Sequence, residues 1–307
     1  MTRAVVFAYH NVGVRCLRVL LDQGVDVALV LTHEDSPTET IWYDSVAQVC
    51  ADHSIPFITP DDANAPNVVA RIRALAPQFF FSFYYRKMLG ADLLGIPTRG
   101  ALNMHGSLLP KYRGRVPVNW AVLHGERETG ASLHYMEIKP DAGNLVAQTA
   151  VPILGDDTAF EVFQKVTVAA ELTLARALPQ LIAGTAPSVP LNLKAGSYFS
   201  GRKPEDGRID WTRTAAEVNN LVRAVAPPYP GAFADLGSKR IIVAKARVAA
   251  AEATSSVPVA GQIARMSNGS LGFVCGDGKL LIPLRLIVED KTLDASASQT
   301  WLATVKQ

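Results

Sequence analysis

The sequence predicts an α/β protein: a doubly wound, Rossmann-like and mainly parallel sheet, followed by a small OB-like β-barrel. Three observations predict this class. In the first half, short apolar runs alternate with longer amphipathic segments, the pattern of parallel strands joined by crossing helices. A long helical segment and two prolines, Pro187 and Pro190, close this part of the chain. After about residue 205, one helical segment is followed by short strands separated by turn signals.

The predicted elements follow in order along the chain. In the first half, strands are expected at residues 4–8, 25–32, 55–59, 78–84, 101–105 and 132–136, and helices at 14–23, 43–53, 67–75 and 158–183. In the second half, a helix is expected at 215–225 and strands at 241–248, 272–275 and 280–284. These elements predict an N-terminal domain at residues 1–186, a linker at 187–204 and a C-terminal domain at 205–307.

Composition excludes several classes of protein. The chain has 307 residues, 49% of them hydrophobic, and a net charge of only +2, so no bulk attraction to nucleic acid or membrane is expected. The three cysteines are scattered without zinc-binding spacing, which fits a reducing compartment. Residues 5–9 are too short for the core of a signal peptide, and no uninterrupted apolar run approaches the ~20 residues of a membrane span. We expect a cytoplasmic protein without metal or membrane insertion.

The turn after the first strand reads Tyr9-His10-Asn11-Val12-Gly13 and contains no G-x-G-x-x-G. The glycines of that motif let a helix N-terminus approach a dinucleotide pyrophosphate. Their absence argues against NAD as a cofactor.

The run from residue 101 to 114, ALNMHGSLLPKYRG, carries the strongest chemical signal. Asn103 and His105 are two residues apart at the end of a predicted strand, so their side chains share a face at the sheet edge where ligands bind. An amide donor can stabilise an oxyanion while an imidazole moves a proton, which is what acyl transfer requires. A satisfied polar pair at a strand end is the alternative. Ser107 lacks the G-x-S-x-G context of a nucleophile, so a structural hydroxyl is expected there.

The string N-x-H-x-S-L-L-P-x-x-x-G resembles the signature of the folate-dependent formyltransferases, which act on glycinamide ribonucleotide, methionyl-tRNA or sugar nucleotides. The resemblance implies 10-formyltetrahydrofolate as co-substrate and a catalytic set of Asn103, His105 and Asp141. From the residues alone, Asp141 in the Pro140-Asp141-Ala142-Gly143 turn is better explained as a turn former than as a catalytic residue. In the family, an aspartate at this place after a strand completes the set, and here His134-Tyr135-Met136 precedes it.

The resemblance also implies the ligand contacts. Folate contacts are expected from Tyr85, Arg86, Lys87, Met88, Arg115, Glu137, Ile138, Lys139, Pro140 and Asp141. Tyr43, in the loop at residues 33–44, and the basic pair Arg202 and Lys203 are expected to contact a sugar nucleotide, with a merely solvated basic pair as the alternative. No spacing singles out the remaining histidines, which are His10, His33, His53, His124 and His134.

Within the family, the resemblance is strongest to enzymes for amino-sugar nucleotides and implies formylation of the 4-amino group of UDP-4-amino-4-deoxy-L-arabinose. Methionyl-tRNA, another amino-sugar nucleotide, or non-catalytic binding remain alternatives. Residues 19–70 contain no Lys or Arg, so the loop at 33–44 would repel the phosphates of tRNA. One bifunctional relative continues into an NAD-dependent dehydrogenase half near where this chain ends, so we expect a monofunctional enzyme, monomeric or weakly oligomeric.

Overall fold

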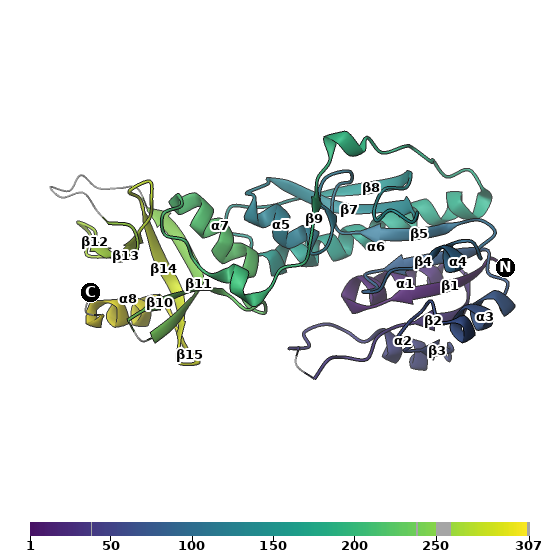
Figure 1. Cartoon of the computed structure of the whole chain (residues 1–307), viewed down its shortest axis with the longest axis horizontal. Coiled ribbons are helices and arrows are strands. Elements are labelled where there is room, and N and C mark those ends of the chain that lie inside the picture. Colours follow the sequence, from purple (N-terminus) through teal and green to yellow (C-terminus); the bar gives the residue numbers. More distant parts are fainter. Residues whose placement is uncertain (38, 238, 250–258, 306–307) are drawn as a thin grey trace. The chain divides into compact units, whose positions relative to one another are not determined.

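The computed structural model describes residues 1–37, 39–237, 239–249 and 259–305. They form two compact units (Figure 1). Unit 1 comprises Met1–Pro117, Glu128–Pro152 and Phe163–Ser200, and unit 2 comprises Val118–Arg127, Ile153–Val162 and Gly201–Gln307. The segment at 187–204 carries short elements of its own, and its residues up to Ser200 belong to unit 1.

Unit 1 is built on a seven-stranded sheet with the order β3-β2-β1-β4-β5-β7-β8. Its strands are β1 (Arg3–Ala8), β2 (Asp26–Leu31), β3 (Phe57–Ile58), β4 (Phe79–Phe83), β5 (Ala101–His105), β7 (Glu128–Tyr135) and β8 (Leu145–Pro152). The first five pair in parallel, whereas β7 runs antiparallel to both β5 and β8. The predicted mainly parallel α/β sheet is therefore confirmed.

The helices that connect the sheet are α1 (His10–Asp22), α2 (Val46–Asp52), α3 (Pro66–Ala74), α4 (Ala91–Leu94), α5 (Pro117–Leu123) and α6 (Ala159–Ala183). Two begin more than one residue away from the predicted start. α1 starts four residues earlier, directly after Tyr9. α2 starts at Val46 instead of Tyr43, because the Ser45 side chain accepts the Gln48 N–H and caps the helix there. Tyr43 therefore lies in the loop that precedes α2.

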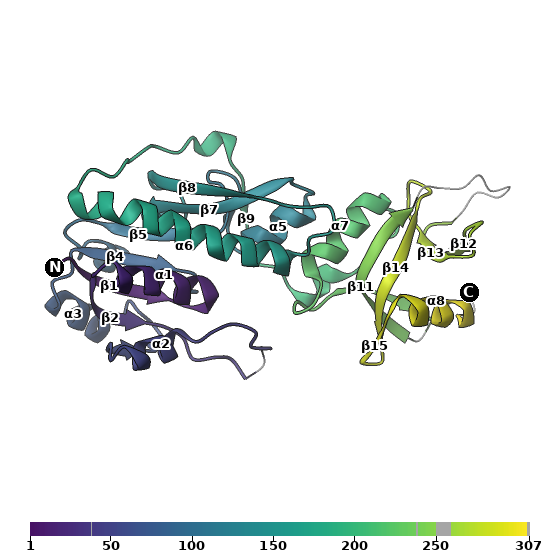
Figure 2. The ribbon, with the colours of Figure 1, turned by 180° about the vertical axis from the view of Figure 1, so that it is seen from behind.

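Helix α6 is the one helix of the described residues that is long and apolar enough to cross a membrane by length and composition. Half of its apolar window is buried inside the protein, and it runs along strands β5, β7 and β8 (Figure 2). Thr158 caps it as predicted: its hydroxyl accepts the Glu161 N–H at 3.4 Å, and the Glu161 carboxylate accepts the Thr158 N–H at 2.7 Å. This is the pattern of a core helix.

The core of unit 1 explains why its strands read as uninterrupted apolar runs. Every residue of β4 is buried, because a parallel strand is covered by helices on both faces. Phe7 and Phe80 meet edge to face at 5.2 Å between ring centroids. Burial on both faces fixes the strand register, and with it the position of polar residues at the carboxyl ends.

Unit 2 contains an antiparallel sheet with the order β10-β11-β14-β13-β12, and β15 also pairs with β14. Its strands are β10 (Ala232–Leu236), β11 (Lys239–Ala249), β12 (Ile263–Arg265), β13 (Leu271–Val274), β14 (Leu280–Val288) and β15 (Lys291–Leu293). Helix α7 (Ala215–Val225) begins at a Thr214–Glu217 capping box, and α8 (Ala295–Thr304), which the sequence analysis did not predict, begins at Asp294. The small C-terminal β domain, predicted as an OB-like barrel, is confirmed and has the form of an antiparallel half-barrel.

Candidate active site

The carboxyl end of β5 carries Asn103 and His105, and the turn between β7 and β8 carries Asp141. β5 and β7 pair so that Asn103 lies opposite His134. Asp141 adopts a left-handed backbone conformation with φ 51°, which aspartate tolerates better than most residues. The short turn thus returns the chain to the end of β5 with the carboxylate directed at the two predicted residues.

Two of the predicted catalytic side chains, Asn103 and His105, converge on one carboxylate oxygen of the third, Asp141. Asp141 Oδ1 lies 3.5 Å from His105 Nδ1 and 3.5 Å from Asn103 Nδ2. The side chains of His105 and Asp141 are only 7% and 12% exposed, so water screens their interaction weakly. The other carboxylate oxygen, Oδ2, accepts the Gly114 N–H at 2.9 Å. The backbone therefore holds Oδ2 of Asp141 in place, while Oδ1 faces the His105 imidazole.

The loop after β5 determines which nitrogen of His105 can exchange a proton. Nε2 lies 2.7 Å from the carbonyl oxygen of Tyr112, and a carbonyl can only accept, so Nε2 carries a hydrogen. The second nitrogen, Nδ1, therefore has the free lone pair and faces Asp141. Ser107 donates its hydroxyl to the Lys111 carbonyl at 2.6 Å, a bond within the loop rather than one to an imidazole.

His134 belongs to the same cluster, and the sequence analysis missed it. Its Nδ1–H donates to the Tyr135 carbonyl at 2.7 Å, which leaves Nε2 as an acceptor 3.2 Å from Asn103 Nδ2 and 3.5 Å from Asp141 Oδ1. His134 thus orients the amide of Asn103. The antiparallel pairing of β5 with β7 brings it there, and that pairing could have been predicted only with the sheet order in hand.

The electrostatics of the cluster favour an ionised Asp141. Burial by itself would raise the pKa of this carboxyl group. The opposing effects of the His105 charge, the nearby His134 and the Gly114 N–H prevail and hold the Asp141 pKa well below its usual range. The site therefore places an ionised carboxylate beside the Nδ1 atom of an imidazole.

The first predicted folate segment lies immediately after β4. Tyr85 stacks on His33 at 4.2 Å, and burial raises the Tyr85 pKa to about 12. The Arg86 guanidinium forms two hydrogen bonds to Glu39, at 2.8 and 2.9 Å. Lys87 Nζ donates to the carbonyls of Pro60 and Asp61. The two basic side chains are thus bound to the protein itself, while the Met88 side chain is 55% exposed.

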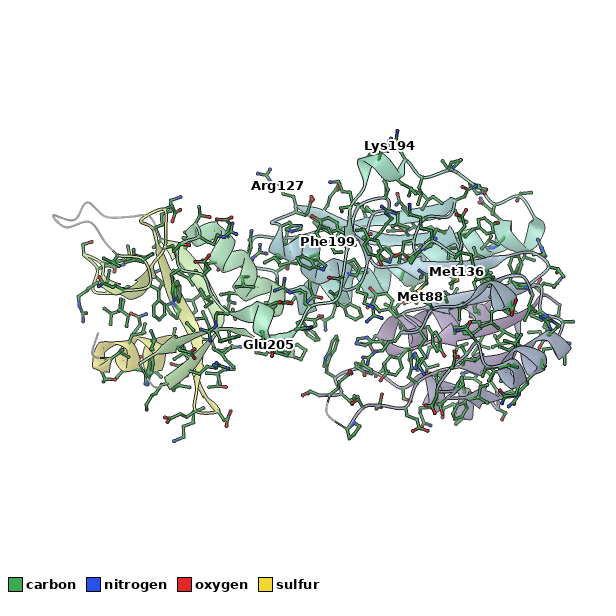
Figure 3. The ribbon with its side chains drawn as sticks, in the orientation of Figure 1. Met88, Arg127, Met136, Lys194, Phe199 and Glu205 are labelled. Atoms are coloured by element: carbon green, nitrogen blue, oxygen red, sulfur yellow. The ribbon has the colours of Figure 1, made fainter. Side chains whose placement is uncertain are left out.

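The second predicted folate segment is the turn at residues 137–141. Glu137, Ile138 and Lys139 are exposed, whereas Asp141 at its end points into the cluster. Met136, just before the turn, packs against the hydrophobic cluster that contains Leu89, and Met136 and Met88 are labelled in Figure 3. The two segments therefore adjoin. The bond from the Gly114 N–H to Asp141 also brings the exposed Arg115 close to this turn.

Tyr43, in the loop before α2, packs into an aromatic cluster. Its hydroxyl bonds to that of Tyr9 at 2.7 Å, and its ring lies 3.9 Å from the ring of His10, which also contacts Trp42 and Phe163. Burial, aided by the charge of Arg86, lowers the His10 pKa to about 3. The sequence analysis gave His10 and His33 no role, but the structure places both in the packing of this loop.

Arg202 and Lys203 lie in unit 2. The Arg202 guanidinium lies over the Trp120 ring at 4.9 Å, and its Nη2 donates to the Asp206 carbonyl at 2.8 Å. Burial lowers the Arg202 pKa. The Lys203 N–H donates to the Asp206 carboxylate at 2.7 Å.

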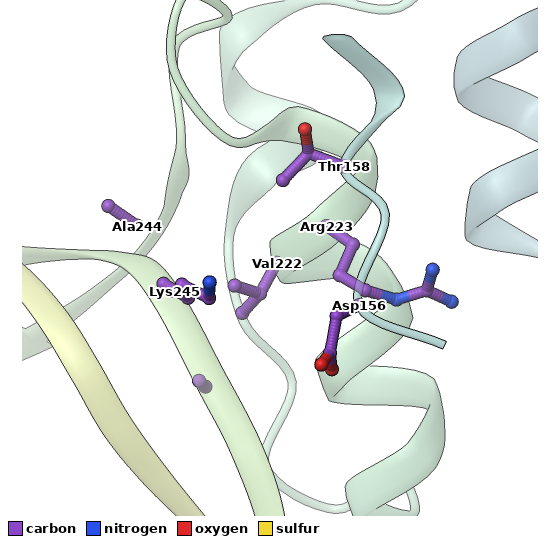
Figure 4. A pocket seen from close by; sticks show the side chains of 7 residues that line it. Asp156, Thr158, Val222, Arg223, Ala244 and Lys245 are labelled. Carbon is purple, nitrogen blue, oxygen red and sulfur yellow. The ribbon is translucent and has the colours of Figure 1, made fainter. Parts of the chain in front are cut away.

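A pocket outside the catalytic cluster is a second candidate for a site, as a group of metal ligands would be. A small pocket in unit 2 is lined by Asp156, Thr158, Val222, Arg223, Ala244, Lys245 and Ala246 (Figure 4). Arg223 in its wall donates to the carbonyls of Leu154 and Asp157, so this residue ties α7 to a loop. Within the described ranges, no three His, Cys, Asp or Glu residues are arranged to hold a metal ion.

Comparison with known families identifies this arrangement. Residues 9–178 match the Formyl transferase family, and residues 202–300 match the Formyl transferase C-terminal domain. The chain belongs to the formyl transferase family. The expectation drawn from the Asn103 and His105 motif is confirmed at this level.

Several solved structures of similar fold are described as formyltransferases. An N-formyltransferase from Helicobacter canadensis, in complex with folinic acid and dTDP-3-aminofucose, is 20% identical with a TM-score of 0.68, and the match covers 92% of this chain and 99% of that one. WlaRD, a sugar 3N-formyl transferase, is 19% identical with a TM-score of 0.70 over 95% and 99% of the chains. A 4-N formyltransferase from Francisella tularensis is 19% identical with a TM-score of 0.65 over 79% and 96%. At these identities the likeness establishes a shared fold.

Proposed function

We propose that this protein transfers the formyl group of 10-formyltetrahydrofolate to the amine of an amino-sugar nucleotide. The observation that carries the proposal is the convergence of Asn103 and His105 on the ionised Asp141, at the carboxyl end of the sheet in a formyl transferase chain. The exposed turn at 137–139 and the adjoining Met88 provide accessible surface beside this buried cluster, where a folate could lie. Solved relatives of this fold contain folinic acid or 5-N-formyl-THF.

The folate supplies the formyl carbon, and the residues of the chain manage charge and protons. As the amine bonds to that carbon, the formyl oxygen gains negative charge, and Asn103 can donate to this oxygen the amide N–H that makes the long 3.5 Å bond to Asp141. His105 Nδ1 takes the proton that the amine must lose, and Asp141 stabilises the resulting imidazolium. The proton then passes to the folate nitrogen as it leaves. His134 holds the Asn103 amide in the donating orientation.

For the acceptor, we propose UDP-4-amino-4-deoxy-L-arabinose. The chain resembles the formyltransferase part of the bifunctional polymyxin-resistance protein in several strings: residues 5–10 (VVFAYH), 81–86 (FSFYYR), 102–115 (LNMHGSLLPKYRGR) and 230–233 (PGAF). That resemblance implies a step towards modified lipid A and polymyxin resistance, performed in the cytoplasm by a monomer or weak homo-oligomer. Solved relatives that contain dTDP or a dTDP sugar support an amino-sugar nucleotide as the class of acceptor.

Methionyl-tRNA fits the loop before α2 poorly. Its described residues include Glu34, Asp35, Glu39 and Asp44, and Arg86, a cation that binds there, is already paired with Glu39. Such a surface repels a phosphate backbone.

A panel of acceptors tests the proposal. The purified protein is given 10-formyltetrahydrofolate with UDP-4-amino-4-deoxy-L-arabinose, dTDP-3-aminofucose or methionyl-tRNA, and the products are identified by mass spectrometry. We expect the UDP sugar to have the highest kcat/KM. Preference for the dTDP sugar would overturn the assignment of the acceptor, preference for tRNA would overturn the class, and no turnover with any of them would favour a binding protein.

The contacts to the nucleotide remain proposals as well. We propose that Arg202, with Lys203, binds the diphosphate, for which the Arg202 guanidinium would have to exchange the Asp206 carbonyl for a phosphate oxygen. Arg202→Ala is then expected to raise the KM for the sugar nucleotide more than the KM for the folate, with little change in kcat. Equal KM values for wild type and variant would assign Arg202 to the packing of Trp120 instead.

A further inference from the structure

Arg113 in β6 (Arg113–Gly114) is a buried cation, and two of its three guanidinium nitrogens have no acceptor in the described part of the chain. The residue is 8% exposed, and its Nε and Nη1 atoms are buried with no hydrogen-bond partner among the residues that the structure describes. The described part of the chain also places no carboxylate within salt-bridge distance of it. Its guanidinium instead lies 5.9 Å from the centre of the Tyr198 ring.

This arrangement is costly unless an anion completes it. A guanidinium is permanently charged, and a buried charge is normally paired with a counter-charge or fully hydrogen-bonded. A ring at 5.9 Å is near the outer limit of a cation–π contact, and it supplies no hydrogen-bond acceptor. Two other arginines of unit 1 show the usual solution: Arg15 and Arg86 each form two hydrogen bonds to a glutamate.

The backbone around Arg113 is held by the catalytic residues. The carbonyl of Tyr112, directly before it, accepts the Nε2–H of His105 at 2.7 Å, and the N–H of Gly114, directly after it, donates to Asp141 at 2.9 Å. β6 also pairs in parallel with β9 (Tyr198–Phe199), and the Arg113 N–H donates to the Ser197 carbonyl at 3.0 Å. Arg113 is therefore fixed beside the catalytic cluster by bonds on both sides.

We propose that Arg113 is an anion-binding residue of the active site and holds an oxyanion of a substrate. The fork of a guanidinium matches the two oxygens of a phosphate or a carboxylate. This inference rests on the proposed function, which offers two such sources: the diphosphate of the sugar nucleotide and the carboxylate tail of the folate. The diphosphate is the source we assign, because it carries more charge and belongs to the same molecule as the amine that must reach His105.

The test is direct binding by titration calorimetry to the full chain and to three variants. Arg113→Met keeps the apolar stem and removes the charge, and Arg113→Lys keeps the charge without the fork. Lys194→Met is the matched control, because Lys194 is an exposed cation of the same unit, close to β9 in sequence (Figure 3). The probes are UDP, inorganic pyrophosphate and folinic acid, and the melting temperature of each unliganded variant is also measured.

We expect Arg113→Met to weaken UDP and pyrophosphate binding by about 10- to 100-fold. Arg113→Lys should fall between this variant and wild type, and Lys194→Met and folinic acid binding should stay unchanged. Because replacing an uncompensated buried charge by an apolar side chain is often neutral or stabilising, unliganded Arg113→Met should melt no lower than wild type.

Other outcomes discriminate clearly. Loss of folinic acid binding alone would keep the anion site but overturn the diphosphate as its source. Unchanged affinities together with a lowered melting temperature would make Arg113 a structural residue and overturn the proposal. If wild type binds UDP through Arg113 but formylates no amino sugar, the anion site stands and the proposed function falls.

Discussion

Replacement of Asp141 by asparagine probes the electrostatic core of the site with a minimal change of shape. The asparagine can place its Oδ1 where it accepts the Gly114 N–H, as Asp141 Oδ2 does now. Its amide N–H₂ would then face His105 Nδ1, which accepts from it in the neutral imidazole. The fold should therefore persist, while the charge that stabilises the imidazolium is removed.

The size of the effect follows from the 3.5 Å between His105 Nδ1 and Asp141 Oδ1. Two unit charges at this separation interact by about 5 kcal/mol at an effective dielectric constant near 20. If about half of the positive charge has developed on the imidazole in the transition state, the loss is about 2 to 3 kcal/mol. We therefore expect Asp141→Asn to lower kcat by about 30- to 150-fold.

The assay is steady-state formyl transfer at saturating folate and sugar nucleotide, together with a thermal melt of the same preparation. A fall in kcat with a melting temperature close to that of wild type supports the charge argument. A kcat within about threefold of wild type would refute it and return Asp141 to the role of a turn former.

Three further predictions address the neighbours of this carboxylate and the aromatic loop. Asn103→Ala and His105→Ala should each lower kcat by about 10²–10³-fold in folded protein, and near-normal turnover in either would contradict its assigned role. His134→Gln should lower kcat more than it changes either KM, because only the orientation of Asn103 is disturbed; equal effects on kcat and both KM values would argue against this role. His10→Asn should make the free energy of unfolding less dependent on pH in acid. The pKa of His10 is about 3 in the folded protein and ~6.5 in the unfolded chain, so between these pH values the wild type loses up to about 1.4 kcal/mol of stability for each unit by which the pH falls. Urea melts that give the same pH dependence for wild type and variant would refute the assignment.

Much of the fold could be predicted because local patterns and burial agree. The apolar run of β4 indicates a strand buried on both faces, and the structure places it in the centre of the sheet. Thr158 at the start of α6 was likewise recognisable as a cap. The start of α2 was misjudged because Trp42 and Tyr43 continue the apolar pattern, and it is the Ser45 cap that begins the helix.

The site was only partly predictable for a related reason. Asn103 and His105 lie on one strand, so their spacing is visible in the sequence. The roles of His134 and Arg113 depend on parts of the chain that are distant in sequence. His134 lies opposite Asn103 on the neighbouring strand, and Arg113 stands out only because the folded chain leaves two of its nitrogens without an acceptor. Long-range pairing of this kind leaves no periodic signal in a single sequence.

The central claim is that the buried cluster transfers a formyl group to an amine. The most direct test uses 10-formyltetrahydrofolate labelled with ¹³C in the formyl carbon. NMR follows this label through a single turnover with UDP-4-amino-4-deoxy-L-arabinose, once with wild type and once with His105→Ala. The account predicts that wild type moves the label into an N-formyl sugar nucleotide and that the variant leaves it on the folate. Release of the label as free formate by wild type, or equal transfer by the variant, would contradict it.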